Sequence, residues 1–537
     1  MDNTAYTLSR SSISIKLWPP SENTRKMLVE RITNNLSTKS IFTEKYRCLG
    51  REEALENAHR IEDLAFVSAN QHYENEPDGD GGSAVQRYAK ECSKLILEVL
   101  KRGPAASEVS NELQLVENGI ATPETFFDIS NGKREFLEAE EAEKLLSPLK
   151  ESNRYAKICF SNRSFGLDAA RVAEPILRSL KDQLKEVDLS DFIAGRPEAE
   201  ALEVMKIFSS ALEGAALKSL NLSNNALGEK GVVAFGDLLK SQSSLEELYL
   251  MNNGISEAAA QAVCDLIPST EKLKILHFHN NMTGDEGAIA IAEVVKCSPL
   301  LENFRCSSTR IGLEGGLALA QALETCTHLK KLDLRDNMFG VEVGISLSKA
   351  LSKHPDLTEA YLSYLNLEDE GATAIFNALK ESVPSLEVLE MAGNDITTEV
   401  APTIVALLKS KQQLIKLNVS ENELKDEGAI QIAEALELTQ LKELDISSNS
   451  IRKAGAKALA LAVADKLKFK LLNLNGNFIP DETIDELRKM FAKSPEILGP
   501  LDENDPDGGD DDEAEDEGSG DDELTSKVEN LHIEDED

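Results

Sequence analysis

The stretch LKSLNLSNN (217–225) decides the fold of this chain, because its pattern returns at a nearly constant spacing. The pattern L-x-x-L-x-L-x-x-N appears again as LEELYLMNN (245–253), LKILHFHNN (273–281) and LKKLDLRDN (329–337). Ten copies begin at Leu217, Leu245, Leu273, Leu301, Leu329, Leu357, Leu386, Leu414, Leu441 and Phe469. Their starts lie 27 to 29 residues apart, and weaker copies precede them. Self-similarity at this period indicates stacked structural units.

Each unit is predicted to contain one short strand and one full helix. The L-x-L core alternates between buried and exposed positions, as a strand does. The second half, such as DEGAIAIAEVVKC (285–297), has apolar residues at helical spacing after an acidic first turn. Because helices are wider than strands, the stack should curve with its strands inside. The predicted fold class is therefore α/β: a leucine-rich-repeat horseshoe of the full-helix, ribonuclease-inhibitor-like type, over residues 151–500.

A column of asparagines is predicted to bond buried backbone between neighbouring units, since an amide both donates and accepts. It includes Asn225, Asn253, Asn281 and Asn337. The column is interrupted at Thr309 and Leu365, where we expect local adjustment. End units expose apolar faces, and the segment 481–494, with Ile484, Leu487 and Phe491 on one side, is predicted to seal the C-terminal end.

The concave strands and the adjoining rim carry the predicted partner-binding residues. These are Tyr249, His277, Arg305, Asp333, Arg335 and Asp336. Their mixture of aromatic, basic and acidic groups is typical of a protein-binding surface rather than a small-molecule pocket. The alternative is that most of them are simply solvated.

Charge narrows the classes of partner. The chain of 537 residues has 57 basic and 95 acidic side chains, a formal charge of −38. This balance argues against nucleic acid and anionic membranes, whose phosphates would be repelled. Residues 501–537 hold 19 acidic residues against one lysine, which predicts a disordered tail. The tail serves either solubility or attraction of a basic partner.

The remaining composition bears on the compartment. Seven cysteines contain no CxxC pair and several lie in apolar helical patterns, so we expect reduced, buried thiols and no metal ligands. No run of 18 apolar residues and no apolar signal core occurs. These features predict a cytosolic or nuclear protein, or one held at a membrane by another protein, without direct insertion.

The N-terminal region has no repeat. Residues 1–10 are predicted to be disordered, 11–103 to form a small helical domain with helices at 51–73 and 84–102, and 104–150 to be a linker. The domain holds the only tryptophan, in Trp18-Pro19-Pro20. Two interpretations compete for that motif. Trp18 is either buried, anchoring a turn, or exposed as an aromatic anchor for a partner helix.

One repeat is irregular. The ladder positions Phe192 and Asn225 are 33 residues apart, where neighbouring steps are 28 or 29. The five extra residues should swell the loop after the strand, within SDFIAGRPEAEA (190–201), on one rim of the horseshoe. That loop carries Arg196, the one cation between Lys185 and Lys206, which either reaches a partner or is simply solvated. Asn252, beside the ladder Asn253, should have its amide free on the same rim.

Catalytic motifs are absent from the sequence. There is no GxxxxGK[ST], no GxSxG, no HExxH and no cysteine–histidine metal spacing. The chain is therefore not expected to be an enzyme with its own substrate pocket. Three classes of function remain possible for this sequence: a binding protein, an inhibitor, or a protein that acts on the active site of another enzyme.

At this point the sequence resembles a known family. FIAGRPEAE (192–200) in the long repeat, LYLMNNG (248–254), the full-helix repeats and the acidic tail are similar to the Ran GTPase-activating proteins. The N-terminal region with Trp18-Pro19-Pro20 resembles the WPP domain of plant members. The resemblance covers nearly the whole chain.

The resemblance implies an activity that is exerted in trans. The repeats would bind the GTP-bound form of the small GTPase Ran and speed its GTP hydrolysis, with Arg196 and Asn252 as the catalytic residues. The arginine would not enter as a conventional finger, and Asn252 would help to orient Ran's own glutamine. No cofactor of its own is implied, since GTP and Mg²⁺ belong to Ran.

The resemblance also implies a location. Trp18, Pro19 and Pro20 would target the chain to coiled-coil proteins of the nuclear envelope, on its outer, cytoplasmic face. There it would keep Ran GDP-bound and support nucleocytoplasmic transport. The alternative is a leucine-rich-repeat scaffold or inhibitor of the ribonuclease-inhibitor type without a GTPase-activating role.

Overall fold

The computed structural model describes residues 18–20, 25, 28–29, 31–33, 36, 49, 51–75, 82–102, 125–130, 134–151 and 155–505. The chain divides into two compact units, 1–120 and 121–537. The predicted disordered N-terminus (1–10) and the tail beyond Asp505 lie outside the described residues. Within the described part, no helix is both long enough and apolar enough to cross a membrane.

The first unit packs its helices around the tryptophan. Helices α3 (Arg51–Asn75) and α4 (Gly82–Arg102) form at the two predicted positions. Trp18 is 1% exposed, lies 5.3 Å from the ring of Phe66 and 5.4 Å from that of Tyr88, and donates from its indole N–H to Asn70 at 3.2 Å. The structure thus favours the buried interpretation, because the indole is stacked on Phe66, packs edge-on with Tyr88 and has almost no exposed surface.

A buried carboxylate fixes the same core. Glu62 accepts from Arg25 at 2.6 Å and from the hydroxyl of Tyr88. These two donors outweigh the effect of burial and lower the pKa of Glu62. Pro19, in contrast, is exposed and Pro20 is half-buried. Only the prolines of the motif therefore present surface to a partner.

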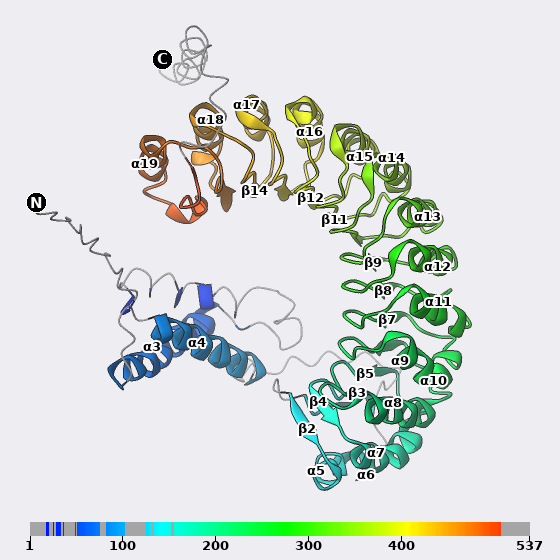
Figure 1. Cartoon of the computed structure of the whole chain (residues 1–537). Coiled ribbons are helices and arrows are strands. Elements are labelled where there is room, and N and C mark those ends of the chain that lie inside the picture. The colour runs from blue at the N-terminus through cyan, green and yellow to red at the C-terminus, as the bar shows by residue number, and fades with distance from the viewer. Residues whose placement is uncertain are drawn as a thin grey trace, which may run out of the picture. The chain divides into compact units, whose positions relative to one another are not determined.

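The second unit is a curved stack with its strands inside and its helices outside (Figure 1). One parallel sheet of 13 strands joins β1 (Thr125–Asp128), β3 (Tyr155–Cys159), β5 (Glu186–Asp188), β6 (Ser219–Asn221), β7 (Glu247–Tyr249), β8 (Ile275–His277), β9 (Asn303–Arg305), β10 (Lys331–Asp333), β11 (Glu359–Tyr361), β12 (Val388–Glu390), β13 (Lys416–Asn418), β14 (Glu443–Asp445) and β15 (Leu471–Asn473). A second, two-stranded sheet pairs β2 (Glu135–Leu137) with β4 (Arg163–Phe165).

A helix follows the strand of each repeat, as predicted, and in the repeat of β6 this helix is divided into two, α9 (Gly228–Ala234) and α10 (Gly236–Lys240). The other helices are α7 (Leu167–Leu180), α8 (Glu198–Leu212), α11 (Glu257–Leu266), α12 (Gly284–Lys296), α13 (Leu313–Leu323), α14 (Gly340–Leu351), α15 (Glu368–Ser382), α16 (Ala401–Ser410), α17 (Lys425–Leu436), α18 (Lys453–Ala464) and α19 (Asp481–Met490), with 3-10 turns at Thr398–Val400 and Pro495–Ile497. The predicted full-helix horseshoe is confirmed.

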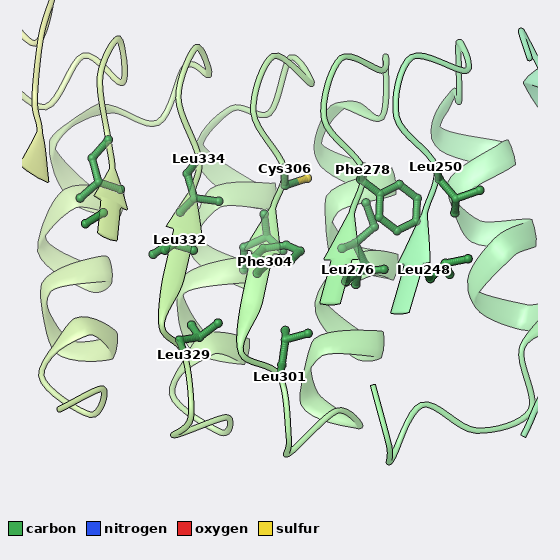
Figure 2. Close-up of a cluster of buried hydrophobic side chains, with 14 of the residues drawn as sticks. Leu248, Leu250, Leu276, Phe278, Leu301, Phe304, Cys306, Leu329, Leu332 and Leu334 are labelled. Atoms are coloured by element: carbon green, nitrogen blue, oxygen red, sulfur yellow. The ribbon is translucent and has the colours of Figure 1, made fainter. Parts of the chain in front are cut away.

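The core is the repeated leucine pattern itself. Figure 2 shows one section, in which Leu276, Phe278, Phe304, Leu332 and Leu334 extend from neighbouring strands toward the helices. All five are at most 1% exposed. Because each coil buries its apolar face only against its neighbours, the array is stable as a stack and not as separate repeats.

The asparagine ladder behaves as predicted. The side-chain amide of Asn253 donates to the Leu222 carbonyl at 3.0 Å, and its oxygen accepts from the backbone N–H of Asn225 at 2.8 Å. At the interruption, Thr309 donates through its hydroxyl to the Cys306 carbonyl at 2.8 Å. The sheet continues across both interruptions, so the expected local adjustment is confirmed.

The predicted linker 104–150 is too long at its C-terminal end. Strands β1 and β2 and helices α5 (Ala139–Leu145) and α6 (Ser147–Glu151) occupy residues 125–151. Phe127, Leu137 and Leu146 lie in the same core as the repeats. The sequence signal was missed because this segment carries no copy of the repeat, yet it covers the first repeat as a cap must.

The C-terminal cap extends further than predicted. Ile484, Leu487 and Phe491 are buried, as expected. The backbone N–H of Asn477 then donates to the side chain of Asn504 at 2.9 Å, and Leu501 is 6% exposed. The first five residues of the predicted tail therefore complete one more ladder turn before the acidic run.

Candidate functional site

The long repeat builds the N-terminal part of the rim, which we define as the loops that follow the strands. Nine residues (189–197) separate β5 from α8, against six (222–227) between β6 and α9. Helix α8 has 15 residues, while α9 and α10 together span 228–240. The prediction that all five extra residues enter the loop is wrong: three do, and two lengthen α8 at its exposed first turn, where extension disturbs no packing.

The enlarged loop runs beside the small sheet of β2 and β4. The backbone N–H of Phe165 donates to the Phe192 carbonyl at 2.8 Å, and the Ser164 hydroxyl donates to the Ala194 carbonyl at 2.7 Å. Asp191 accepts both hydrogen bonds of the Arg134 fork, at 2.6 and 3.0 Å. Strand β4 and Arg134 of the segment 125–151 thus hold the loop together.

Arg196 lies inside this arrangement. Its Nη1 donates to Glu138 at 2.6 Å, its Nη2 to the Ser164 carbonyl at 2.7 Å and the Leu137 carbonyl at 3.2 Å, and its Nε to the Ser164 hydroxyl at 3.3 Å. The side chain is only 8% exposed. Neither of the two sequence interpretations, a cation reaching outward or a solvated one, describes it, because every guanidinium nitrogen already has a protein acceptor.

A glycine and an aromatic ring complete the surroundings of the guanidinium. A Cβ on Gly166 would lie 2.8 Å from Glu138 and 2.9 Å from Arg196, so this position has no room for a side chain. Phe136 places its ring 4.8 Å from the guanidinium carbon. The ring is 56% exposed, although its neighbour Leu137 is fully buried. Arg196 therefore supports an exposed aromatic surface and does not itself form that surface.

Asn252 belongs to a column of residues that each precede a ladder position. The rim column comprises Asn224, Asn252, Asn280, Ser308, Asp336, Tyr364, Gly393, Glu421, Ser448 and Gly476, and all ten have positive φ. Asn252 donates from Nδ2 to Asn224 at 3.0 Å and accepts at Oδ1 from Asn280 at 3.0 Å. The expectation that its amide is free is wrong, because asparagines occupy the equivalent positions of the two neighbouring repeats and bind it.

The rim column borders two open grooves. One is lined by residues 193–196 and 224–230, next to Arg196. The other is lined by Asn252, Asn280, Met282, Arg310, Met338 and Tyr364. Met338 is more than half exposed and Asp336 is exposed beside it. The rim thus offers amide, cationic and apolar contacts together.

The concave face carries the other predicted residues in one row. The parallel register aligns Tyr249 with His277, His277 with Arg305, and Arg305 with Asp333. Arg335 turns back from the loop to bind Asp333 at 2.9 Å and Glu390 at 2.9 Å. The row is therefore brought together as predicted, and its charges are paired with one another.

Two members of the row are less accessible than a contact surface requires. His277 is 7% exposed. Its Nε2 is hydrogen-bonded to Oδ1 of Asn303 at 3.2 Å, and its ring packs edge-on against Tyr249. Burial is the main cause that lowers the pKa of His277 to about 3, and the Arg305 charge adds to it. Asp333 is 3% exposed. Tyr249, Arg305 and Arg335 are half-buried and present more surface.

Known proteins match both units. A WPP domain model matches residues 14–110, and a leucine-rich-repeat model matches four segments, 216–236, 325–348, 411–433 and 438–460. RAN GTPase-activating protein 2 of Arabidopsis thaliana is 73% identical over 500 residues, which cover 93% of this chain and 92% of that protein. RAN GTPase-activating protein 1 of the same plant is 61% identical, covering 95% and 94%. The chain belongs to the Ran GTPase-activating proteins.

The first unit is shared more widely. WPP domain-containing protein 1 of Arabidopsis thaliana is 38% identical over 90 residues, which cover 17% of this chain and 57% of that protein. In this Ran GTPase-activating protein the WPP unit is therefore a separable module joined to a repeat unit.

Sequence reasoning missed the residues that surround the two candidate catalytic positions. Glu138 and Phe136 fell in the segment assigned to the linker, and no local pattern connects them to Arg196 across about sixty positions. Asn224 and Asn280 did leave a signal. The doublet Asn-Asn occurs at 224–225, 252–253 and 280–281, so three successive repeats of this Ran GTPase-activating protein repeat the same rim residue.

Proposed function

We propose that the chain stimulates GTP hydrolysis by Ran through its repeat unit, acting at the active site of Ran and not at a pocket of its own. The observation that carries this proposal is the near full-length match to RAN GTPase-activating proteins, which includes both the repeat unit and the long repeat. GTP and Mg²⁺ belong to Ran in this scheme. The scaffold or inhibitor alternative is not favoured, because it gives no reason for that match.

Within the site, Asn252 is the residue that reaches the partner. It is exposed on the rim, and its carboxamide keeps a second N–H and a second lone pair beyond the two hydrogen bonds it makes in the column. An amide of fixed orientation that contacts Ran's glutamine would lower the cost of placing the attacking water. That is catalysis by positioning, which can supply several kcal/mol of barrier reduction, roughly 7 to 11 in the best oriented systems.

Arg196 acts through the loop in this proposal. Its guanidinium donates hydrogen bonds to Glu138, Ser164 and Leu137. It therefore holds the 189–197 loop and Phe136 in the conformation that binds Ran. This arrangement supports a positioning role for Arg196, consistent with an arginine that does not enter the nucleotide site. Binding of Ran in its GTP-bound form involves Tyr249, Arg305 and Arg335 of the concave row and Asp336 of the rim, with His277 and Asp333 supporting that row from beneath.

The WPP unit supplies the location. We propose that it docks the chain to coiled-coil proteins on the outer, cytoplasmic face of the nuclear envelope, so that Ran is kept GDP-bound there. The support is the match to other WPP proteins and the exposed Pro19 on a rigid tryptophan core.

A single-turnover assay with purified, GTP-loaded Ran tests the activity directly. The full chain at saturating concentration should accelerate phosphate release by several orders of magnitude, as activators of small GTPases do, by about 10⁵ in the best-studied case. Binding of GTP-loaded Ran without acceleration would instead establish the scaffold alternative. Ran loaded with a nonhydrolysable analogue provides the control for binding alone.

A further inference from the structure

The rim column contains a directional chain of amides centred on Asn252. Asn280 donates from Nδ2 to Oδ1 of Asn252 at 3.0 Å, and Asn252 donates from Nδ2 to Oδ1 of Asn224 at 3.0 Å. The three residues occupy equivalent positions in successive repeats, 28 residues apart. The φ values of Asn224, Asn252 and Asn280 are 62°, 53° and 57°, so all three residues have the same left-handed φ.

This chain decides which way the Asn252 carboxamide faces. An asparagine side chain can rotate by half a turn and exchange its donor and acceptor ends at little steric cost. Here the exchange would set the Asn252 oxygen against the Asn224 oxygen and its N–H groups against those of Asn280. If Asn252 alone turned, two hydrogen bonds would become two repulsive contacts, so the orientation of its neighbours determines its own.

In this chain Asn280 is the donor end and Asn224 is the acceptor end. Asn280 must donate for Asn252 to accept, and Asn224 needs only an acceptor oxygen. In the described column the next members are Ser308 and Asp336, which have no side-chain amide. The amide chain is therefore confined to the two neighbours that flank Asn252, which is where an orienting device for that residue must lie.

We propose that Asn280 is a positioning residue for GTPase activation, which fixes the orientation of Asn252 by donating to it, while Asn224 serves as the acceptor that completes the chain. This inference rests on the proposed role of Asn252 toward Ran. Asn280 stays on the rim and acts on the reaction through Asn252.

A charge-matched pair of variants separates orientation from charge. Asn280→Asp replaces the donor by a carboxylate that can only accept, so Asn252 must turn its N–H groups toward it and present the opposite edge. Asn224→Asp adds the same charge on the other side but keeps an acceptor, so the orientation survives. Aspartate is tolerated at positive φ in this column, because Asp336 already occupies it with φ 56°.

The measurement is single-turnover GTP hydrolysis by Ran over a range of full-length activator concentrations, with the melting temperature of each variant. Asn280→Asp should lower the saturating rate by about tenfold or more, with a half-saturating concentration near that of the wild type, because misorientation affects the transition state more than binding. Asn224→Asp should lose much less of the saturating rate than Asn280→Asp does, because it keeps the acceptor that Asn252 needs. Melting temperatures should be unchanged, since all three side chains are exposed.

Asn252→Gly separates failure of this inference from failure of the proposed function. Glycine accepts the positive φ and removes the amide. Full activity in Asn252→Gly would overturn the role of Asn252 and the inference with it. A large loss in Asn252→Gly with a wild-type rate in Asn280→Asp would overturn the inference alone. Equal losses in the two aspartate variants would also overturn it, because charge and not orientation would then be the cause.

Discussion

The Nη1 of Arg196 lies 2.6 Å from the carboxylate of Glu138, across 58 residues of chain. This ion pair joins the one irregular repeat to the cap segment that precedes the repeats. A cation that the sequence places on an exposed loop is instead 8% exposed and bound on every nitrogen. The extra residues of the long repeat and the cap segment 125–151 therefore determine the conformation of the 189–197 loop together.

The hydrogen bonds of Arg196 to Glu138, Ser164 and Leu137, here called the clamp, indicate that another cation cannot replace this arginine. Arg196→Lys keeps a cation but loses the planar fork that binds Ser164, Leu137 and Glu138 together. We expect both Arg196→Lys and Arg196→Ala to lose most of the stimulation of Ran GTP hydrolysis, by about 10² or more. Single-turnover rates measure this, and near wild-type rates in Arg196→Lys would rule out the clamp.

Glu138 should share part of that loss. Glu138→Gln keeps the size of the side chain and removes its charge, so the charge-assisted bond to Arg196 weakens while Ser164 and Leu137 still accept. A loss of activity smaller than that of Arg196→Ala is expected, at an unchanged melting temperature. Glu203→Gln, on the exposed face of α8, makes the same change of charge and should have no effect.

The two asparagines 252 and 253 should separate activity from stability. Asn252→Gly should cost activity and leave the melting temperature unchanged. Asn253→Ala removes a fully buried amide and leaves the backbone N–H of Asn225 unpaired, at about 1 to 3 kcal/mol, while the Leu222 carbonyl keeps its bond from the Asn225 side chain. Differential scanning calorimetry beside the hydrolysis assay distinguishes them. Identical profiles for the two variants would show that the division of roles is mistaken.

Trp18 should matter for targeting through the stability of its unit. Trp18→Ala opens the core formed with Phe66 and Tyr88 and should destabilise the helical unit by about 3 to 5 kcal/mol. The variant should be released from the nuclear envelope in cells and become sensitive to proteolysis within 1–120, while its activity on Ran persists.

Pro19→Ala is the informative partner of that experiment, because Pro19 is exposed. If Pro19→Ala releases the chain from the nuclear envelope without increasing proteolysis, Pro19 contacts the anchoring protein directly. Normal localisation of both variants would contradict a docking role for the motif.

Acid should weaken the repeat unit through its buried histidines. The pKa of His277 is lowered to about 3 and that of His354 to about 4, so both stay neutral in the folded state. Unfolded histidines protonate near pH 6.5, and the stability is thus full above that pH and is lost as the pH falls toward the folded values. At pH 5.5 the loss from His277 should be about 1.4 kcal/mol.

His277→Phe removes one of these titrating groups and keeps a ring against Tyr249. The decrease of the unfolding free energy between pH 7 and 5.5, followed by denaturant titration, should become shallower than in the wild type. An unchanged slope in His277→Phe would show that His277 takes up its proton over the same pH range in the folded and unfolded states.

Much of this structure follows from the sequence because the determining interactions recur. Each L-x-L strand contacts the same positions of the next repeat, so a spacing of 28 residues fixes partner, register and burial together. The ladder role of Asn253, the C-terminal cap at Ile484 and Leu487, and the concave row from Tyr249 to Asp333 all follow from that periodicity.

What the tertiary structure alone decides lies where the period stops or where two repeats meet. No local signal joins Arg196 to Glu138 or Trp18 to Asn70, because these contacts bring together segments that share no pattern. The orientation of Asn252 is likewise a property of three neighbouring coils and not of its own repeat. The sequence determined the scaffold because its packing is periodic, and the fold decided the site because its contacts are not.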